Sequence, residues 1–310
     1  MLVSVLAIVD IGSNSVKILV AKMQQGVLDE LHIDSETTSL ARGLPQTGRI
    51  SQESITATLD VMRRFRKDVD RLQVKNIQIV GTAALREASN PEDLTKTIEE
   101  IMGSPVSIIS GEEEARLSLR GALTARPDTS SEKECSFVDL GGASTELGYL
   151  HPELQIVSTS LGALKTHNLL EIGGEPTPDK KWQEAKEFIS SILEKEVAKT
   201  LKKEIQNKKT FIAVGGTIVM ACKAMGLKDF KNNCFNFQRT ELEMFADKLR
   251  KIPDFKRAQI PELSKDRSDI LPFGMMVLTE CMKFFEQEKG ISTVRGLRHG
   301  LALNLLDTKS

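Results

Sequence analysis

The chain has 310 residues, a length that usually corresponds to two domains of ~100–200 residues each. Hydrophobic residues make up 40% and charged residues 27% of the sequence, which is typical of a soluble globular protein. The formal net charge of −1 excludes general electrostatic attraction as the basis of polyanion binding. A polyanionic partner would therefore have to be held by local basic patches.

The cysteines and the apolar segments point to a cytoplasmic protein. The four cysteines have no paired spacing, which argues against a disulfide framework and against a zinc site. Residues 1–9 are apolar, but they lack a basic leading region and run directly into Asp10, so they predict a core strand and not a signal peptide. No apolar run approaches the ~18–20 residues of a membrane helix. The cysteines are Cys135, Cys222, Cys234 and Cys281.

The first half of the chain alternates predicted strands and helices. Residues 6–9 predict a strand that leads into the turn Asp10-Ile11-Gly12-Ser13-Asn14-Ser15 and a second strand over 16–21. A helix follows from residue 51, with apolar residues at helical spacing as far as residue 69. Further strands are predicted at 77–80 and 106–109, and further helices at 92–102 and from residue 112. Strands and helices alternating at this length indicate an α/β fold.

The second half opens with the same pattern of strand, aspartate, glycine and hydroxyl. The strand 136–138 leads into Asp139, two glycines, two hydroxyls and Glu146, and a partial third copy ends in Gly215-Gly216-Thr217. Glycine adopts the backbone angles of tight turns and leaves amide N–H groups open to a phosphate. An aspartate at a strand tip is well placed to hold Mg²⁺. The repetition predicts two related lobes that face each other across a cleft.

Basic residues are concentrated in one later segment. A long helix is predicted from 179 to 205, and residues 180–209 hold nine lysines against five glutamates. A solvated helix face is the first interpretation, and a surface that guides an anion is the alternative. Arg267 is a further candidate to contact an anionic chain. Thr217 could bind phosphate or cap its helix, and the loop that carries it is expected to form a wall of the cleft.

Three acidic residues open the helix that begins near residue 112, in the sequence Ser110-Gly-Glu-Glu-Glu-Ala-Arg116. Acidic residues at a helix N-terminus complement the helix dipole, which is the simplest explanation. This helix also starts at a strand tip, and open α/β sheets bind their ligands at the C-terminal ends of strands. A carboxylate there could take a proton from a water molecule beside a bound phosphate.

Four of these motifs occur in the order seen in the exopolyphosphatase/guanosine pentaphosphate phosphatase (Ppx/GppA) family, which the chain resembles over nearly its whole length. The resemblance extends through Gly215-Gly216-Thr217 to Arg298-His299-Gly300. It implies an α/β fold of two actin-like (RNase H-like) ATPase-superfamily domains with an interdomain cleft, in a short two-domain form. The motifs are Asp10–Ser15, Gly81–Arg86, Ser110–Leu117 and Asp139–Glu146.

The resemblance also implies the limits of the two domains. Domain I is expected over residues 1–127, with a C-terminal helix at 299–310 packed back on it, and domain II over 128–298. Residues 128–134 are polar and read as a linker.

The resemblance assigns roles to individual residues. Glu114 matches the general base that activates the attacking water, and Arg86 matches an arginine that contacts phosphate. Asp139 and Glu146 match the acids associated with Mg²⁺ and the phosphate site. The expected phosphate-binding residues are Asp10, Gly12, Ser13, Asn14, Ser15, Gly141, Gly142, Ala143, Ser144, Gly215, Gly216, Thr217 and Arg267.

The chain departs from the family pattern at two positions. Ala143 stands where many relatives have a third glycine, and its methyl group could narrow the approach of the backbone to phosphate. His299 stands where a glutamate is more common, and we expect it to be a surface histidine.

The function implied is that of an Mg²⁺-dependent exopolyphosphatase that hydrolyses the terminal phosphoanhydride of inorganic polyphosphate. Hydrolysis of guanosine pentaphosphate at its 5′ end is the close alternative, because the motifs do not separate the two substrates. A phosphotransferase on the same fold and a non-catalytic sensor of polyphosphate or nucleotide are more remote alternatives. A homodimer is expected from the family, with no nucleic acid or membrane partner.

Overall fold

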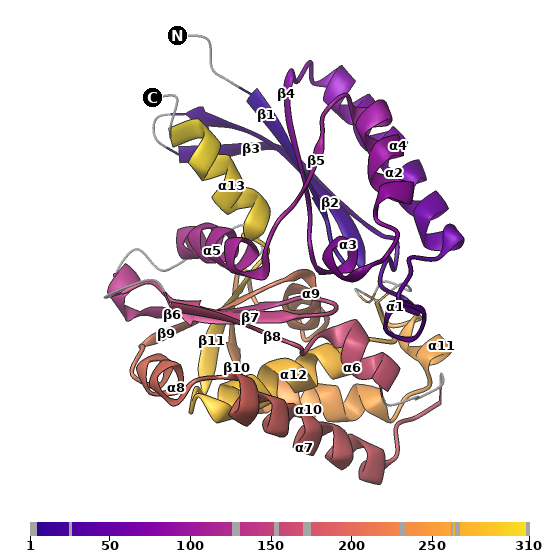
Figure 1. Cartoon of the computed structure of the whole chain (residues 1–310). Helices are drawn as coiled ribbons and strands as arrows, with labels where there is room; N and C mark the ends of the chain where they lie inside the picture. Colours follow the sequence, from indigo (N-terminus) through magenta and orange to yellow (C-terminus); the bar gives the residue numbers. More distant parts are fainter. Residues whose placement is uncertain are drawn as a thin grey trace. The chain divides into compact units, whose positions relative to one another are not determined.

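A computed structural model describes residues 5–24, 27–125, 131–151, 155–169, 175–229, 234–261, 263 and 267–307. The chain divides into two compact units, one made of residues 1–117 and 297–310 and the other of residues 118–296 (Figure 1). The division lies upstream of the domain boundary expected at residue 127, and residues 128–130 of the expected linker lie outside the described residues.

The first unit is built on a five-stranded sheet with the order β3-β2-β1-β4-β5. Strands β1, β2 and β3 form an antiparallel meander, and β4 and β5 extend the sheet parallel to β1. The apolar run of β1 is buried throughout its centre, which explains why it forms an inner strand. The bounds are β1 Val5–Ile11, β2 Ser15–Gln24, β3 Val27–Thr37, β4 Asn76–Gly81 and β5 Val106–Ile108.

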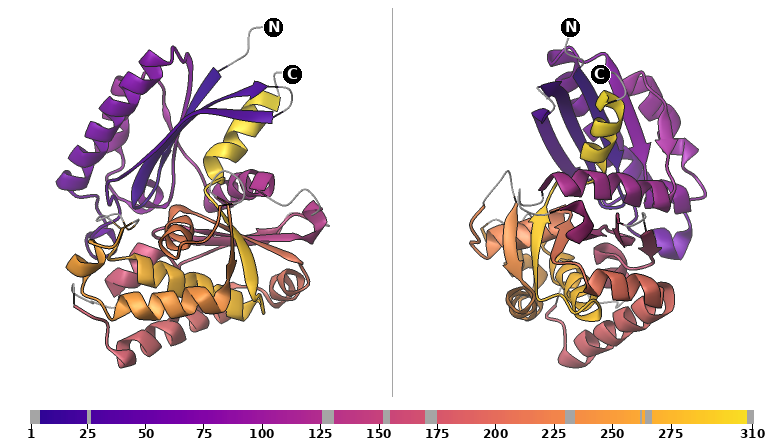
Figure 2. Two further views of the ribbon diagram at one scale, coloured as in Figure 1. Left: turned by 180° about the vertical axis from the view of Figure 1, so that it is seen from behind. Right: turned by 90° about the vertical axis from the view of Figure 1, so that its left-hand side faces the viewer.

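Helices cover both faces of this sheet. Helix α2 begins where the Ser51 side chain accepts a hydrogen bond from the Ser54 amide, and α2 and α4 pack together on one face (Figure 2). Helix α13 lies on the other face, where Ala302 and Leu306 join the core of β1 and β2. The helices are α1 Leu44–Thr47, α2 Gln52–Arg71, α3 Ala83–Glu87, α4 Glu92–Met102, α5 Gly111–Ala122 and α13 Leu297–Asp307, and α5 runs across the division between the units.

The start of α13 is fixed by buried charged groups, so the expectation of a surface His299 was wrong. His299 is 1% exposed, and its Nε2 lies 3.3 Å from Oε1 of Glu30. The neighbouring Arg298 guanidinium donates hydrogen bonds to the carbonyls of Ile18 and Asp34, at 2.5 and 3.4 Å. Burial lowers the pKa of Arg298, and the negative charges of Asp10, Glu30 and Asp34 oppose that shift. These contacts anchor the helix to β2 and β3.

The second unit contains a six-stranded sheet with the order β10-β11-β9-β6-β7-β8. Strands β6, β9 and β11 are parallel, while β7, β8 and β10 run antiparallel to their neighbours. The bounds are β6 Cys135–Leu140, β7 Thr145–Tyr149, β8 Gln155–Thr159, β9 Thr210–Val214, β10 Phe235–Gln238 and β11 Lys289–Thr293.

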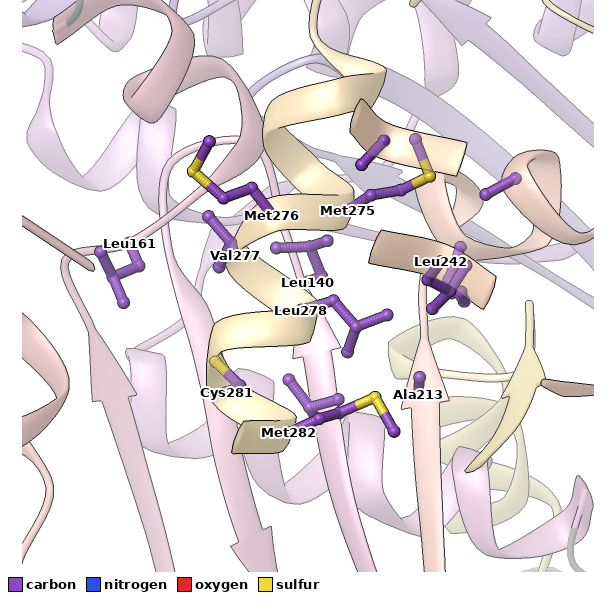
Figure 3. Packing of buried hydrophobic residues seen from close by; sticks show 14 of the residues in the cluster. Leu140, Leu161, Ala213, Leu242, Met275, Met276, Val277, Leu278, Cys281 and Met282 are labelled. Atoms are coloured by element: carbon purple, nitrogen blue, oxygen red, sulfur yellow. The ribbon is translucent and has the colours of Figure 1, made fainter. Parts of the chain in front are cut away.

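Helix α12 forms the centre of the second core. It is buried along residues 271–282 and therefore shows no polar face, as expected for a helix enclosed by other elements. Figure 3 shows Met275, Leu278 and Met282 among the apolar side chains of the sheet and of α10. Burial raises the pKa of the Cys222 thiol to about 11 and that of Cys281 to about 12, so both thiols stay protonated at neutral pH. The surrounding helices are α6 Ala163–Leu169, α7 Asp179–Glu196, α9 Gly216–Ala224 and α10 Arg239–Arg250.

The helix predicted from 179 to 205 is broken. Helix α7 ends at Glu196 and α8 spans Lys199–Gln206, because Val197 and Ala198 adopt extended backbone angles. Val197 is buried in the same core as Leu193 and Leu201, so the break keeps its side chain inside the unit. Several lysines of this segment are paired with neighbouring glutamates, which fits the interpretation as a solvated face. The remaining helical segments are η1 Leu123–Ala125, η2 Glu132–Glu134 and α11 Asp254–Arg257.

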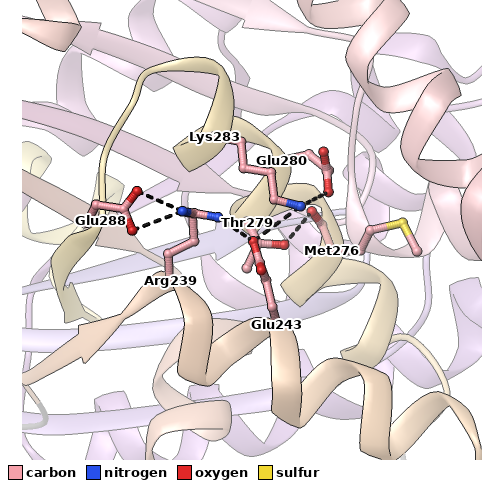
Figure 4. A network of polar contacts seen from close by, with 7 residues as sticks. All are labelled: Arg239, Glu243, Met276, Thr279, Glu280, Lys283 and Glu288. Carbon is pink, nitrogen blue, oxygen red and sulfur yellow. Dashed lines mark hydrogen bonds and ion pairs between the residues drawn. The ribbon is translucent and has the colours of Figure 1, made fainter.

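An ion network fastens α10 to α12 and to the turn before β11 (Figure 4). The Arg239 guanidinium pairs with Glu243 at 2.8 Å and with both oxygens of Glu288. Lys283 bridges Glu243 and Glu280 at 3.2 and 2.9 Å. The hydrogen bond to Glu288 is the main cause that raises the pKa of Arg239.

The described helices were also compared with the length and hydropathy that a membrane span requires, and none of them meets both.

Candidate active site

Three connections leave the first sheet side by side. Ile11 pairs with Gly81, and Gly81 pairs with Ile108, so the parallel strands β1, β4 and β5 end at the same edge. The Thr82 amide donates to the Ile11 carbonyl at 3.2 Å, and the Ile109 amide donates to the Gly81 carbonyl at 3.1 Å. The first glycine turn, the start of α3 and the start of α5 therefore lie together, where open α/β sheets bind ligands.

The first glycine turn is closed by its own backbone. The Gly12 amide donates to the Ser15 carbonyl at 3.1 Å, and a Cβ on Gly12 would lie 3.0 Å from that oxygen. The carbonyls of Ser13 and Asn14 accept hydrogen bonds from the segment at 38–41, which fixes the turn from the other side. The Asp10 carboxylate is buried beneath the turn, 3.5 Å from the ammonium of Lys17.

Of the three acidic residues that open α5, Glu114 is the one that meets Arg86. Glu114 Oε2 lies 3.2 Å from Arg86 Nη1, which also donates to the Ile109 carbonyl at 2.7 Å. Glu113 instead forms a two-pronged ion pair with Arg116, and Glu112 is exposed. The Glu114 and Arg86 side chains are 14% and 29% exposed, so the pair is mostly buried but still accessible to solvent. An ionised carboxylate held in this way can accept a proton from water.

The second unit places two carboxylates on one face of its sheet. Asp139 and Glu146 are direct partners across β6 and β7, and cross-strand partners project to the same side. Glu146 is 2% exposed, and its Oε1 accepts a hydrogen bond of 2.7 Å from the Ser158 hydroxyl on β8. No group of three or more His, Cys, Asp or Glu residues suited to a metal ion occurs in the part of the chain that the structure describes.

The residues at the start of α6 pack directly against the second glycine turn. The Gly141 amide donates to the Ser144 carbonyl at 3.0 Å, which repeats the closure of the first turn. A Cβ on Gly162 would lie 2.5 Å from the Gly142 carbonyl oxygen and 2.6 Å from the backbone of Ala143, so only glycine allows this contact. Ala143 is 8% exposed, which leaves most of its methyl group covered.

The third glycine turn lies beside the second and is contacted by the side chain of Arg267. Gly215 has a φ of 125°, and a Cβ there would lie 2.9 Å from the Leu140 carbonyl oxygen. A Cβ on Gly216 would lie 2.1 Å from Arg267 Nη1, so the guanidinium rests on this glycine. Thr217 is buried, with its methyl group against Gly274 of α12. The positive charge of Arg267 therefore lies directly against the third glycine turn.

The predicted residues form one set in each unit. The first unit brings together Asp10, the turn to Ser15, Arg86 and Glu114 at one sheet edge. The second unit brings together the carboxylates, the two glycine turns and Arg267. That the two sets face one another across a cleft stays a prediction.

Sequence reasoning missed the residues that support these sets. Ser158 and Gly162 belong to none of the recognised motifs. Their roles follow from contacts between elements, which the local sequence does not reveal.

Comparison with known proteins agrees with the motif order. The model of the Ppx/GppA phosphatase family matches residues 19–309. The chain belongs to the Ppx/GppA phosphatase family.

Solved structures show that the fold is also that of Ppx/GppA proteins. An exopolyphosphatase-like protein is similar with a TM-score of 0.87 and 22% sequence identity, over 97% of each chain. An exopolyphosphatase from Cytophaga hutchinsonii has a TM-score of 0.85 and 19% identity, over 98% of each chain. The Ppx/GppA family member from Aquifex aeolicus has a TM-score of 0.76 and 22% identity, over 99% of each chain. The predicted α/β fold is confirmed, with one mixed sheet in each of the two units.

We expect Gly215→Ala to destabilise this Ppx/GppA protein strongly. Its backbone conformation is accessible almost only to glycine, and the added methyl group would press on the Leu140 carbonyl. The free energy of unfolding should fall by on the order of 3 kcal/mol. Gly226→Ala is the matched control, because Gly226 has a φ of 71° with open space around it and should cost about 1 kcal/mol. Denaturant titration measures both, and equal losses would contradict the assignment of strain to Gly215.

Proposed function

We propose that the protein is an Mg²⁺-dependent phosphohydrolase that removes the terminal phosphate from inorganic polyphosphate. The observation that carries the proposal is the pairing of Glu114 with Arg86 at the sheet edge that also holds the first glycine turn. Membership of a phosphatase family supports the reaction class. Two similar structures are named as an exopolyphosphatase and an exopolyphosphatase-like protein, and these names support the choice of polyphosphate over guanosine pentaphosphate in this proposal.

Glu114 is the general base in this proposal. A water oxygen attacks the terminal phosphorus, the bond to the bridging oxygen breaks, and the proton of the water passes to the Glu114 carboxylate. Phosphoryl transfer spreads negative charge over the non-bridging oxygens, so positioning and electrostatic stabilisation supply most of the rate. The Arg86 guanidinium already lies beside the base and can offset part of that charge.

The carboxylates of the second unit fit a magnesium ion. Mg²⁺ is usually held by one or two carboxylates together with water and substrate phosphates. Asp139 and Glu146 supply two carboxylates on one face, and Ser158 fixes the orientation of the second. When bound there, Mg²⁺ would neutralise charge on the phosphate oxygens.

The glycine turns and Arg267 complete the proposed phosphate site. The turns at Gly12–Ser15, Gly141–Ser144 and Gly215–Thr217 are rigid, because each is held by backbone contacts within its own unit. Rigid turns can present amide groups to an anion without an ordering cost at binding. A homodimer stays an expectation from the family.

Glu114→Gln should remove turnover and keep substrate binding. The amide keeps the shape of the side chain but cannot accept the proton, so we expect kcat to fall by about 10²–10⁴-fold. A phosphate-release assay should compare short polyphosphate, long polyphosphate, guanosine pentaphosphate and ATP. Glu113→Gln is the matched control on the same helix, since Glu113 pairs with Arg116, and it should stay close to wild type. Full activity of Glu114→Gln would contradict the proposal.

Removal of the metal should stop phosphate release, and Mg²⁺ should restore it. Asp139→Asn and Glu146→Gln each remove one anionic ligand, so half-maximal activity should require at least about tenfold more Mg²⁺. Glu184→Gln, which changes an exposed carboxylate on α7, is the control. Unchanged activity in excess chelator, or a wild-type Mg²⁺ dependence of both variants, would show that these carboxylates do not bind the metal.

A further inference from the structure

Helix α6 is attached directly to the second glycine turn. The amide of Ala163 donates to the Gly141 carbonyl at 3.1 Å, and the amides of Leu164 and Lys165 donate to the Gly142 carbonyl at 2.9 and 3.0 Å. The hydroxyl of Thr145 closes the other side, at 3.0 Å from the Leu161 carbonyl. The backbone of Lys165 is therefore held one hydrogen bond away from the turn that is proposed to bind phosphate.

The side chain of Lys165 differs from the paired lysines of the second unit. It is half-buried, and within the described ranges its ammonium forms no hydrogen bond or ion pair with the protein. Some lysines elsewhere in the unit have carboxylate partners, which are Glu184 for Lys180, Glu194 for Lys202, Glu134 for Lys209, Asp247 for Lys251, and both Glu243 and Glu280 for Lys283. An ammonium beside a glycine turn can give its charge to phosphate oxygens.

A second cation stands at the neighbouring turn. Arg267 rests on Gly216, and the segment that carries Lys165 meets the third glycine turn at Gly274 of α12. A Cβ on Gly274 would meet Thr217 Cγ2 at 2.6 Å, Ala163 Cβ at 3.1 Å and Leu140 Cδ2 at 3.5 Å. The end of β6 and the starts of α6 and α9 thus share one packing point. Lys165, through its backbone, and Arg267, through its guanidinium, therefore contact two glycine turns at one end of the sheet.

We propose that Lys165 is a further substrate-binding residue, whose ammonium binds non-bridging oxygens of a phosphate chain held at Gly141–Ser144. With Arg267 at the next turn, the second unit then has two cations that can bind successive phosphoryl groups of one chain. A single orthophosphate would not need both. The ligand class is a linear anion of three or more phosphates. This inference rests on the proposed function, because it takes the same turns as the phosphate site.

The direct test is calorimetric binding of a methylene-bridged triphosphate, which water cannot cleave, to the full chain. Lys165→Met keeps the apolar stem and removes the charge, so the affinity should fall about tenfold. The slope of log affinity against log salt should also decrease in magnitude by about one, as expected for the loss of one phosphate contact. Lys165→Arg should restore most of the affinity, which a purely structural role of the ammonium would not require.

Lys203→Met is the matched control. Lys203 is an exposed lysine on α8, which immediately precedes the beginning of β9, whereas Lys165 lies beside the turn after β6. Because β6 and β9 are parallel, these are opposite ends of the sheet, and the control should bind as wild type. Thermal unfolding should show both methionine variants folded. Wild-type affinity and wild-type salt slope in Lys165→Met would overturn the inference.

Steady-state kinetics separates this inference from the proposed function. Lys165→Met should raise KM for polyphosphate about tenfold, with a smaller change in kcat, since the lost contact binds substrate and does not transfer a proton. If the wild-type chain releases no phosphate from any substrate, the proposed function fails, and the calorimetry still decides the role of Lys165. If the wild-type chain releases phosphate from polyphosphate but does not bind the triphosphate analogue, the inference about Lys165 is overturned and the proposed function stands.

Discussion

The ion pair between Arg86 and Glu114 depends on the way three parallel strands end together. Because β1, β4 and β5 finish in register, the helices that follow β4 and β5 start side by side, and Arg86 of the first meets Glu114 of the second at 3.2 Å. In a partly exposed setting such a pair adds on the order of 1 kcal/mol or less to stability. Its importance is therefore chemical, since it fixes one carboxylate at a ligand-binding edge.

In the second unit, close backbone contacts fix the position of the candidate site. Glycines at 162, 215 and 216 allow α6, β6 and Arg267 to approach at distances that any larger residue would prevent. These contacts fix the glycine turns before any ligand binds. A site that is ordered in advance stabilises developing charge without reorganisation, which is the main requirement of phosphoryl transfer. The same contacts make the turns sensitive to substitution.

The sequence predicted the elements that local patterns determine. The glycine turns, the acidic start of α5 and the strands beneath them each have a signature of a few residues, and their order along the chain indicated the family. The preference for Glu114 came from the resemblance, and the structure adds a reason, because Glu113 is engaged by Arg116 while Glu114 reaches Arg86.

Features that depend on contacts between residues far apart in the sequence could not be predicted from local patterns. His299 is polar and suggests a surface position, yet Glu30 on β3 accompanies it in the interior. The helical periodicity of residues 179–205 is continuous, but the core takes Val197 in an extended conformation and divides the helix. Ser158 and Lys165 carry no motif, and their proximity to Glu146 and Gly142 arises only when β8 and α6 pack against the second turn.

The central claim is that the protein directs water at the end of a phosphoanhydride chain, and hydrolysis of polyphosphate in ¹⁸O-labelled water tests it most directly. The account predicts one ¹⁸O atom from water in each orthophosphate released by the wild-type chain, and none in the shortened polyphosphate. Label in the shortened chain, or released phosphate without label, would contradict it.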